Sequence, residues 1–378
     1  MTTMFEIEPT GSGAATGASL PVGIVIPNYN HADLVGAAIE SALAQDYSNV
    51  RVVVVDDGST DGSREVIAAY KPRIKALFQA NTGHTKACLN GWREIETPIV
   101  MFLDADDLLA PGAVSAVARA WRSRISKVQF QLEVIDEAGM PTGVVFPKFP
   151  AGYDDGDHLA ELLRACGHLS PPTTGNAYAA SLLKELTTFE DLPRYIDSAL
   201  NLMAPFSGRV VTLREPLGCY RVHGTNVWLM RDFSLDSIER RMTLERDQHR
   251  LLQQICKRYG VPLDAKRAFR NMLSHQENRL ALAKFGQGRA MAEPLLGVLL
   301  DNLRAQAGCA YSLRQRLMLM TWVVLVAILP QRVAKQVLMQ RMSPSSRSPV
   351  IERLVSLLSW PRRQAVPPPE LASSSGST

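Results

Sequence analysis

Three carboxylates follow an apolar run within the sequence MFLDADDLLAP, residues 101–111. Asp104, Asp106 and Asp107 come directly after residues typical of a buried strand, and because unpaired charge in an apolar interior is very costly, they should lie where that strand emerges. Residues i and i+2 of extended backbone point the same way, which predicts that Asp104 and Asp106 face one site. Carboxylates held that close need a cation or a proton, and oxygen ligands suit Mg²⁺ or Mn²⁺. The alternative is an acidic turn followed by a helix that begins at Pro111.

The segments around these carboxylates alternate between short apolar runs and amphipathic stretches. Buried strands are predicted at Val22–Ile26, Val50–Val55, Ile74–Gln79 and Ile99–Leu103. Helices are predicted between them, at His31–Gln45, near Val66–Tyr70 and near Thr85–Ile95. This alternation predicts an α/β fold with a mostly parallel, doubly wound sheet and helices on both faces.

Polar clusters end three of the predicted strands. They are PNYN at residues 27–30, DDGSTDGS at residues 56–63 and DADD at residues 104–107. Ligands of such sheets bind beyond the carboxyl ends of the strands, so the three clusters together predict a nucleotide site. Asp61 is a candidate N-cap for the helix that follows, and Asp56 is expected to cap the DDGSTDGS turn with its own side chain.

The run VGIVIPNYNHADLVGAAIESALAQDYSNVRVVVVDDGSTDGS, followed by NTGH and FLDADD, resembles the nucleotide-sugar domain of the large inverting family 2 glycosyltransferases. The resemblance is continuous from Val22 to about Ala118 and readable to about Asn226. It implies the GT-A fold and metal-dependent, inverting transfer of a sugar from a nucleotide-sugar, with UDP as the expected nucleotide. The implied acceptor is a glycan or a lipid-linked molecule in cell-surface polysaccharide assembly.

The resemblance also implies roles for single residues on the donor side. Pro27 and Tyr29 match positions that flank the base, and Asp57 matches the carboxylate that accepts a hydrogen bond from the uracil ring. Asp104 and Asp106 match the D-x-D pair, which contacts the ribose and holds the diphosphate-bound metal, Mn²⁺ or Mg²⁺.

Other matched positions leave alternatives open. Asp107 matches a further carboxylate that some members use at the metal, and Gly83 lies in the matching NTGH loop. The sequence then departs from an Arg-Asn pair common in the family, so Lys86 is either a substitute phosphate contact or a solvated helix lysine. His223, in the segment YRVHG, resembles a histidine that approaches the metal or the diphosphate; a hydrogen-bonded structural histidine is the alternative.

A general base should come from the acceptor-binding half of the domain. Asp197 opens an apolar helix that runs to about Phe206 and matches the acidic position where the family keeps its base. An aspartate near a helix start is also a routine cap. Glu190 and Asp191 are the fallback candidates for the base.

The C-terminal third differs in character from the rest. Helices are predicted at Ser234–Tyr259, Pro262–Lys284 and Ala290–Ala307. Leu317–Leu329 is apolar but shorter than the roughly 20 residues of a membrane-spanning helix, which favours a buried or interfacial helix. Ten basic and three acidic residues give residues 301–378 a net charge of +7, against +4 for the whole chain. This charge suits either attachment to anionic lipid of the inner leaflet or a helical bundle with a solvated basic face.

The chain divides, on this interpretation, into a flexible tail, two halves of a catalytic domain, a helical region that is a candidate for membrane association, and a disordered tail. The predicted boundaries are residues 1–20, 21–125, 126–230, 231–342 and 343–378. Five cysteines without paired spacing and an N-terminus unlike a signal peptide favour a cytoplasmic protein, peripheral on the inner membrane face if it binds lipid. A nucleic-acid partner is not expected.

Two further functions remain open from the sequence. A metal-dependent nucleotidyltransferase would usually carry a Gly-rich, basic phosphate loop after the first strand, which PNYNHADL lacks. A non-catalytic protein that keeps the fold and binds nucleotide or a membrane complex is disfavoured by the intact acidic cluster.

Overall fold

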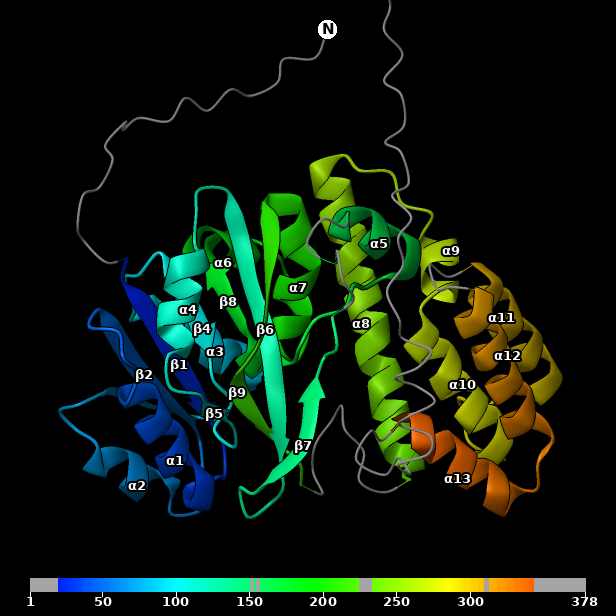
Figure 1. The fold of residues 1–378 in the computed structure, drawn as a ribbon, viewed down its shortest axis with the longest axis horizontal. Helices are drawn as coiled ribbons and strands as arrows, with labels where there is room; N and C mark the ends of the chain where they lie inside the picture. Colours follow the sequence, from blue (N-terminus) through cyan, green and yellow to red (C-terminus); the bar gives the residue numbers. More distant parts are fainter. Residues whose placement is uncertain (1–19, 150–152, 154–156, 224–232, 309–312, 343–378) are drawn as a thin grey trace, which may run out of the picture. The chain divides into compact units, whose positions relative to one another are not determined.

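A computed structural model describes residues 20–149, 153, 157–223, 233–308 and 313–342 (Figure 1). The chain forms two compact units. The first contains the chain up to Val145 together with Ser170–Arg221, and the second contains Phe146–Leu169 and the chain from Val222 onward. The predicted tails, apart from Leu20, lie outside the described residues, and the predicted domain boundaries stay predictions.

Within the described residues, the first unit is built on a nine-stranded sheet in the order β3-β2-β1-β4-β8-β6-β9-β5, with β7 paired to β6. The strands are β1 Val22–Asn28, β2 Val50–Asp57, β3 Lys75–Gln79, β4 Ile99–Phe102, β5 Leu108–Leu109, β6 Ile125–Ile135, β7 Pro141–Phe146, β8 Asn176–Ala179 and β9 Arg209–Arg221. The predicted class, α/β with a mostly parallel sheet, is confirmed.

The parallel register of the first four strands determines where ligand-binding groups can lie. β2, β1 and β4 are neighbours, with Val25 opposite both Val53 and Phe102. Their carboxyl ends therefore meet at one edge of the sheet, as the polar clusters after the predicted strands required. All seven residues of β1 are buried, which explains its unbroken apolar pattern.

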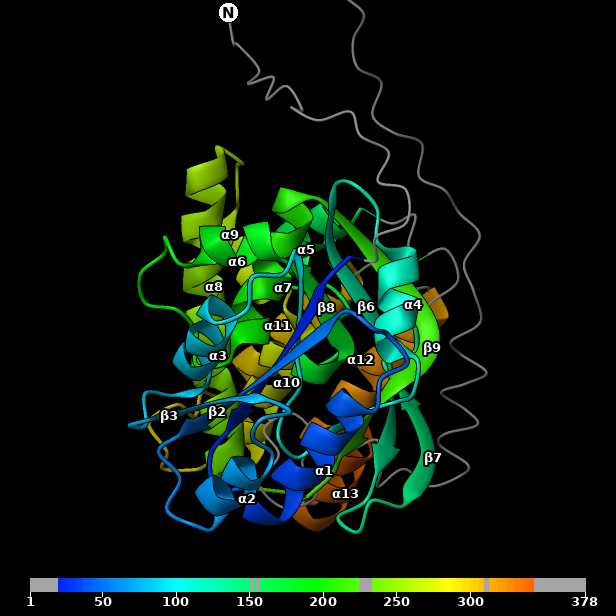
Figure 2. The same cartoon turned by 90° about the vertical axis from the view of Figure 1, so that its left-hand side faces the viewer.

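Helices cover both sides of this sheet, as predicted. They are α1 Ala32–Leu43, α2 Ser63–Ala69, α3 His84–Arg93, α4 Ala113–Ala120, α6 Ala180–Leu186 and α7 Ile196–Ser207, with a short 3₁₀ turn η2 at Thr173–Gly175. Figure 2 shows α3, α6 and α7 on one side of the strands and α1 and α4 on the other. A Cβ at Gly91 would lie 2.5 Å from Val25 and 2.8 Å from Val55, so glycine there lets α3 lie directly on β1 and β2.

The second unit is helical among its described residues. Its helices are α5 His158–Ala165, α8 Leu235–Tyr259, α9 Ala265–Arg270, α10 Leu273–Phe285, α11 Leu295–Gly308, α12 Leu313–Ile328 and α13 Gln331–Met342. α8 ends at Gly260, whose φ of 66° is the left-handed conformation that glycine allows. The prediction of a single helix at Pro262–Lys284 was wrong, because two helices, α9 and α10, occupy this segment. Asn271 ends α9, and its side chain donates to the carbonyl of Arg164, a contact the local sequence does not reveal.

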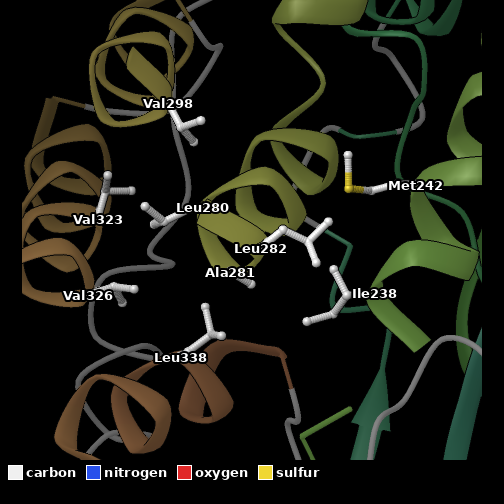
Figure 3. Packing of buried hydrophobic residues seen from close by; sticks show 9 residues of the cluster. All are labelled: Ile238, Met242, Leu280, Ala281, Leu282, Val298, Val323, Val326 and Leu338. Atoms are coloured by element: carbon white, nitrogen blue, oxygen red, sulfur yellow. The ribbon is translucent and has the colours of Figure 1, made fainter. Parts of the chain in front are cut away.

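Apolar side chains from five helices form the core of this unit (Figure 3). The fully buried members are Ile238 and Met242 on α8, Leu280, Ala281 and Leu282 on α10, Val298 on α11, Val323 and Val326 on α12, and Leu338 on α13. The predicted apolar segment Leu317–Leu329 thus contributes one buried helical face. None of the helices that the structure describes is long and apolar enough to cross a membrane.

Candidate active site

Asp56 holds the loop after β2 in place. It is completely buried, and its carboxylate accepts hydrogen bonds from the Ser59 amide (3.1 Å), Arg64 Nε (2.9 Å) and Asn28 Nδ2 (3.1 Å). The predicted role of Asp56 as a cap of this turn is confirmed. Asp61 lies one residue before the N-cap of α2, which is Gly62, and accepts from the Ser63 amide instead of being the N-cap itself.

Asp57 joins β2 to the loop before α3. Its Oδ1 accepts from the Thr82 amide (2.8 Å) and from Gln79 Nε2 (2.7 Å), and its Oδ2 accepts from the Gly83 amide (2.8 Å). Gly83 has a φ of 91° and forms the N-cap of α3. The site predicted for a nucleotide base therefore has a fixed wall, formed by Asp57 and the loop that it holds.

The DADD segment is a turn and not extended backbone. The Asp107 amide donates to the Asp104 carbonyl (3.1 Å), so the argument that Asp104 and Asp106 alternate along a strand was wrong. Asp107 is buried, and its Oδ2 and Oδ1 accept from Thr174 Oγ1 (2.6 Å) and the Arg221 amide (2.9 Å). These bonds give Asp107 a structural role, and the metal contact predicted for it stays a prediction.

The three carboxylates of this turn repel one another. Burial raises the pKa of Asp107 well above its usual value, and the charges of Asp106 and Asp104 raise it further. Asp104 and Asp106 remain partly exposed. No group of three metal-ligating side chains is assembled among the described residues, but Mg²⁺ and Mn²⁺ sites commonly use one or two carboxylates together with substrate phosphates. The excess of negative charge and the oxygen donors of Asp104 and Asp106 fit such an ion.

His84 belongs to this site, although the sequence analysis gave it no role. Its Nε2 lies 3.1 Å from Asp104 Oδ1, and its ring centroid lies 5.4 Å from that of Tyr195. Burial lowers the pKa of His84, whereas Cys88 and Asp104 raise it, and the result lies well above the usual value. Burial also raises the pKa of the Cys88 thiol, so Cys88 is uncharged at neutral pH and Asp104 is the lasting partner of His84. The sequence feature that could have identified His84 is its position directly after the loop that follows a predicted strand.

α3 brings the start of α7 to the same site. Thr85 Oγ1 donates to the Pro193 carbonyl (2.7 Å), and the Thr85 amide donates to the Arg194 carbonyl (3.2 Å). α7 then begins at Ile196 with Tyr195 as its N-cap, so Asp197 is in the first turn but is not the N-cap residue.

Asp197 is a buried carboxylate that is not fully satisfied. It is 6% exposed, and its Oδ1 has no hydrogen-bond partner in the part of the chain that the structure describes. Burial and then the charge of Asp104 raise its pKa to about 6, while His84, the Ser198 amide and Lys127 act in the opposite direction. The charges of Asp104 and His84 therefore both affect the pKa of Asp197. The fallback candidates Glu190 and Asp191 lie exposed in the turn before α7.

The remaining predicted residues lie at the expected strand and helix ends, and their roles stay predictions. Pro27 is buried near the end of β1, Tyr29 after it is 47% exposed, and Lys86 is exposed on α3. His223 follows β9 but belongs to the second unit. Lys127, which lies within the apolar strand β6 and acts on Asp197, was missed by the sequence analysis.

Comparison with known proteins gives consistent results. Residues 23–142 match the family described as glycosyl transferase family 2. An uncharacterized glycosyltransferase of Nostoc sp. is 33% identical over 216 residues, which cover 55% of this chain and 66% of the relative. The chain spans less than two thirds of the length of the curated relatives it matches.

Two solved structures share the fold. S. aureus TarS 1–349 in complex with UDP-GlcNAc aligns with a TM-score of 0.51 at 15% identity, over 85% of this chain and 91% of that one. The mannosyltransferase PcManGT from Pyrobaculum calidifontis, in complex with GDP-Man and Mn²⁺, aligns with a TM-score of 0.51 at 19% identity, over 90% of this chain and 88% of that one.

Replacing Asp56 should destabilise the first unit. Asp56→Ala leaves buried donors unpaired, and we expect the free energy of unfolding in urea to fall by about 2–3 kcal/mol. Arg64→Met removes only the partly exposed partner of the pair and should cost no more than about 1 kcal/mol. A loss in Asp56→Ala no larger than that in Arg64→Met would contradict the structural role.

Proposed function

We propose, from the match of residues 23–142 to glycosyl transferase family 2 and the 33% identity to an uncharacterized glycosyltransferase of Nostoc sp., that this chain moves a sugar from a nucleotide-sugar to an acceptor hydroxyl with inversion at the anomeric carbon. The observation that carries the proposal is Asp197, a buried carboxylate whose Oδ1 has no hydrogen-bond partner within the described residues and whose ionisation is opposed by the charge of Asp104. Such a group suits a general base next to a donor site.

The donor would bind at the carboxyl ends of β2, β1 and β4. Pro27, Tyr29, Asp57 and Gly83 would contact the base, and Lys86 is a candidate phosphate contact. A UDP-sugar is the proposed donor. The proteins of similar fold that bind UDP-GlcNAc or GDP-Man support a nucleotide-sugar of this kind.

A divalent ion, Mn²⁺ or Mg²⁺, would be held by Asp104 and Asp106, with Asp107 as a further candidate ligand. When bound, it would neutralise the charge that develops on the diphosphate. His84 Nε2 already donates to Asp104 Oδ1 at 3.1 Å and would fix the orientation of that carboxylate.

Asp197 would take the proton of the acceptor hydroxyl. The acceptor oxygen then forms a bond to the anomeric carbon as the bond from that carbon to the diphosphate breaks, and the nucleoside diphosphate leaves with the electron pair. Attack opposite the leaving group inverts the configuration. A glycan or lipid-linked acceptor in cell-surface polysaccharide assembly is the proposed substrate class.

The second unit would hold the protein on the cytoplasmic face of the membrane. α12 exposes Leu313 (71%), Leu317 (54%) and Ile328 (68%), and the exposed cations Arg314 and Arg332 lie on α12 and at the start of α13. Exposed apolar side chains beside cations complement an anionic lipid surface, where each cation contributes about 1 kcal/mol.

Donor binding should depend on the metal. UDP should raise the melting temperature only when Mn²⁺ or Mg²⁺ is present, because the carboxylates of Asp104 and Asp106 would otherwise repel the negatively charged diphosphate. Asp106→Asn should abolish the metal-dependent part of the shift, whereas Asp33→Asn, a change in the first turn of α1, should keep it. An equal shift in excess chelator would rule the metal out.

Removing the charge of Asp197 should separate activity from stability. With a donor and acceptor found by screening nucleotide-sugars, Asp197→Asn should lower transfer about 10²–10⁴-fold while UDP binding survives. In the wild type, transfer should rise as the pH increases through about 6, where Asp197 ionises.

The stability of Asp197→Asn should move in the opposite direction to its activity. The folded pKa of about 6 lies above the usual value of 3.8, so the wild type loses stability as the pH rises from about 4 to 6. Above that range the ligand-free variant should be more stable by about 1–3 kcal/mol. Asp191→Asn is the matched exposed control. If Asp191→Asn lost transfer while Asp197→Asn kept it, the general base would have to be assigned to the turn before α7 instead.

Membrane binding should need both charge and the apolar face of α12. Co-sedimentation with vesicles of about 30% anionic lipid should fall at high salt. Added salt shortens the Debye length, which is about 8 Å at physiological ionic strength, and so weakens the attraction between the cations of the protein and the lipid surface. Leu317→Asp should weaken it, whereas Met140→Asp, an equally exposed apolar site in the first unit, should not. Equal binding to neutral vesicles would exclude an electrostatic contribution.

A further inference from the structure

Lys127 is a lysine with no exposed surface in the middle of β6. Its Nζ lies 2.6 Å from Asn201 Oδ1, 2.6 Å from Ser170 Oγ and 2.9 Å from Gln129 Oε1. Lysines are almost never fully buried without a charged partner, and none of these three groups is charged.

The partners of Lys127 match an ammonium group. An ammonium has three N–H donors and no acceptor, and it meets three oxygens. Gln129 Nε2 donates to Thr212 Oγ1 at 3.1 Å, which turns the Gln129 oxygen toward Lys127. Ser170 Oγ donates to the Pro171 carbonyl at 3.3 Å, which leaves its lone pairs for Lys127.

Among the described residues, Asp197 is the carboxylate whose charge acts on Lys127. No carboxylate among the described residues forms an ion pair with Lys127, yet burial lowers its pKa well below the usual value and the charge of Asp197 raises it. Asn201, which accepts from Lys127, lies four residues after Asp197 on α7, so the two share one face of that helix. Tyr178 also donates to Asn201 Oδ1, at 3.0 Å.

We propose that Lys127 is a positioning residue for Asp197: its hydrogen bonds to Asn201, Ser170 and Gln129 hold a buried ammonium beside the face of α7 that carries Asp197, so that its positive charge acts on that carboxylate. The inference rests on the proposed function, since it describes the environment of the proposed base. It predicts that neutralising Lys127 changes the ionisation of Asp197, whereas loosening Asn201 alone does not.

The other groups that act on Asp197 come from three other elements. Asp104, after β4, opposes its ionisation, and His84 on α3 favours it. Cys88 on α3 and Tyr178 on β8 also interact with Asp197, but burial raises the pKa of both, so they are uncharged at neutral pH. Lys127 is thus a cation that acts on Asp197 from β6, whereas the proposed donor residues Asp104 and His84 act on it from the end of β4 and from α3.

The test is a ¹³C NMR titration of the aspartate carboxyls in the full, ligand-free chain, with the Asp197 signal assigned by its loss in Asp197→Asn. The wild-type midpoint should be about 6. Lys127→Met, which is similar in size and apolar, should raise the midpoint by about one pH unit. Lys127→Gln removes the charge but keeps a donor for Asn201, and it replaces Lys127→Met if that variant does not fold by circular dichroism.

Tyr178→Phe is the matched control, because it removes the other hydrogen bond to Asn201 and leaves every charge in place. Its midpoint should equal that of the wild type. An unchanged midpoint in folded Lys127→Met or Lys127→Gln would overturn the proposal, as would an equal rise in Tyr178→Phe. The titration needs no substrate: a shifted midpoint with normal transfer in Asp197→Asn would keep this coupling and reject Asp197 as the base.

Discussion

A buried carboxylate must find hydrogen-bond donors or a compensating charge, and the aspartates of the first unit differ in how far they do so. Asp56, Asp57 and Asp107 have donors from the protein at both oxygens, and each fixes a loop at the carboxyl edge of the sheet. Asp104 has His84 beside it, and Asp197 has one oxygen with no hydrogen-bond partner in the part of the chain that the structure describes. The satisfied aspartates hold the loops that form the walls of the site, including the wall at which the base is proposed to bind, and Asp104 and Asp197 are the proposed groups for the metal and for proton transfer.

The sheet could be predicted from the sequence because its signal is local. β1 and β2 are nearly continuous apolar runs, since parallel strands are buried on both faces, and each is followed by a cluster of turn residues. The same local signals predicted α7 and the end of α8 at Gly260. They failed at α9 and α10, where a side-chain contact to a distant carbonyl ends the first helix.

The detail of the site could not be predicted, because it depends on residues far apart in the chain. The donors to Asp107 are 67 and 114 residues away, and Thr85 meets Pro193 over 108 residues. Spacing within DADD suggested extended backbone, whereas those distant donors stabilise a turn. Nothing in the local sequence singled out Lys127, and only the fold gives it Asn201 and Ser170 as hydrogen-bond partners and brings it within reach of the charge of Asp197.

The distance at which cations act on Asp197 matters for the proposed chemistry. A salt bridge would occupy the carboxylate oxygens and hold the pKa of Asp197 well below neutral, which would make it a poor proton acceptor. If no cation lay near Asp197, burial would favour its protonated form, which cannot accept a proton. His84 and Lys127 both lower the pKa of Asp197, although neither forms an ion pair with it within the described residues, and the balance against burial and Asp104 puts that pKa at about 6. At neutral pH such a group is largely ionised yet still basic, the combination that a general base requires.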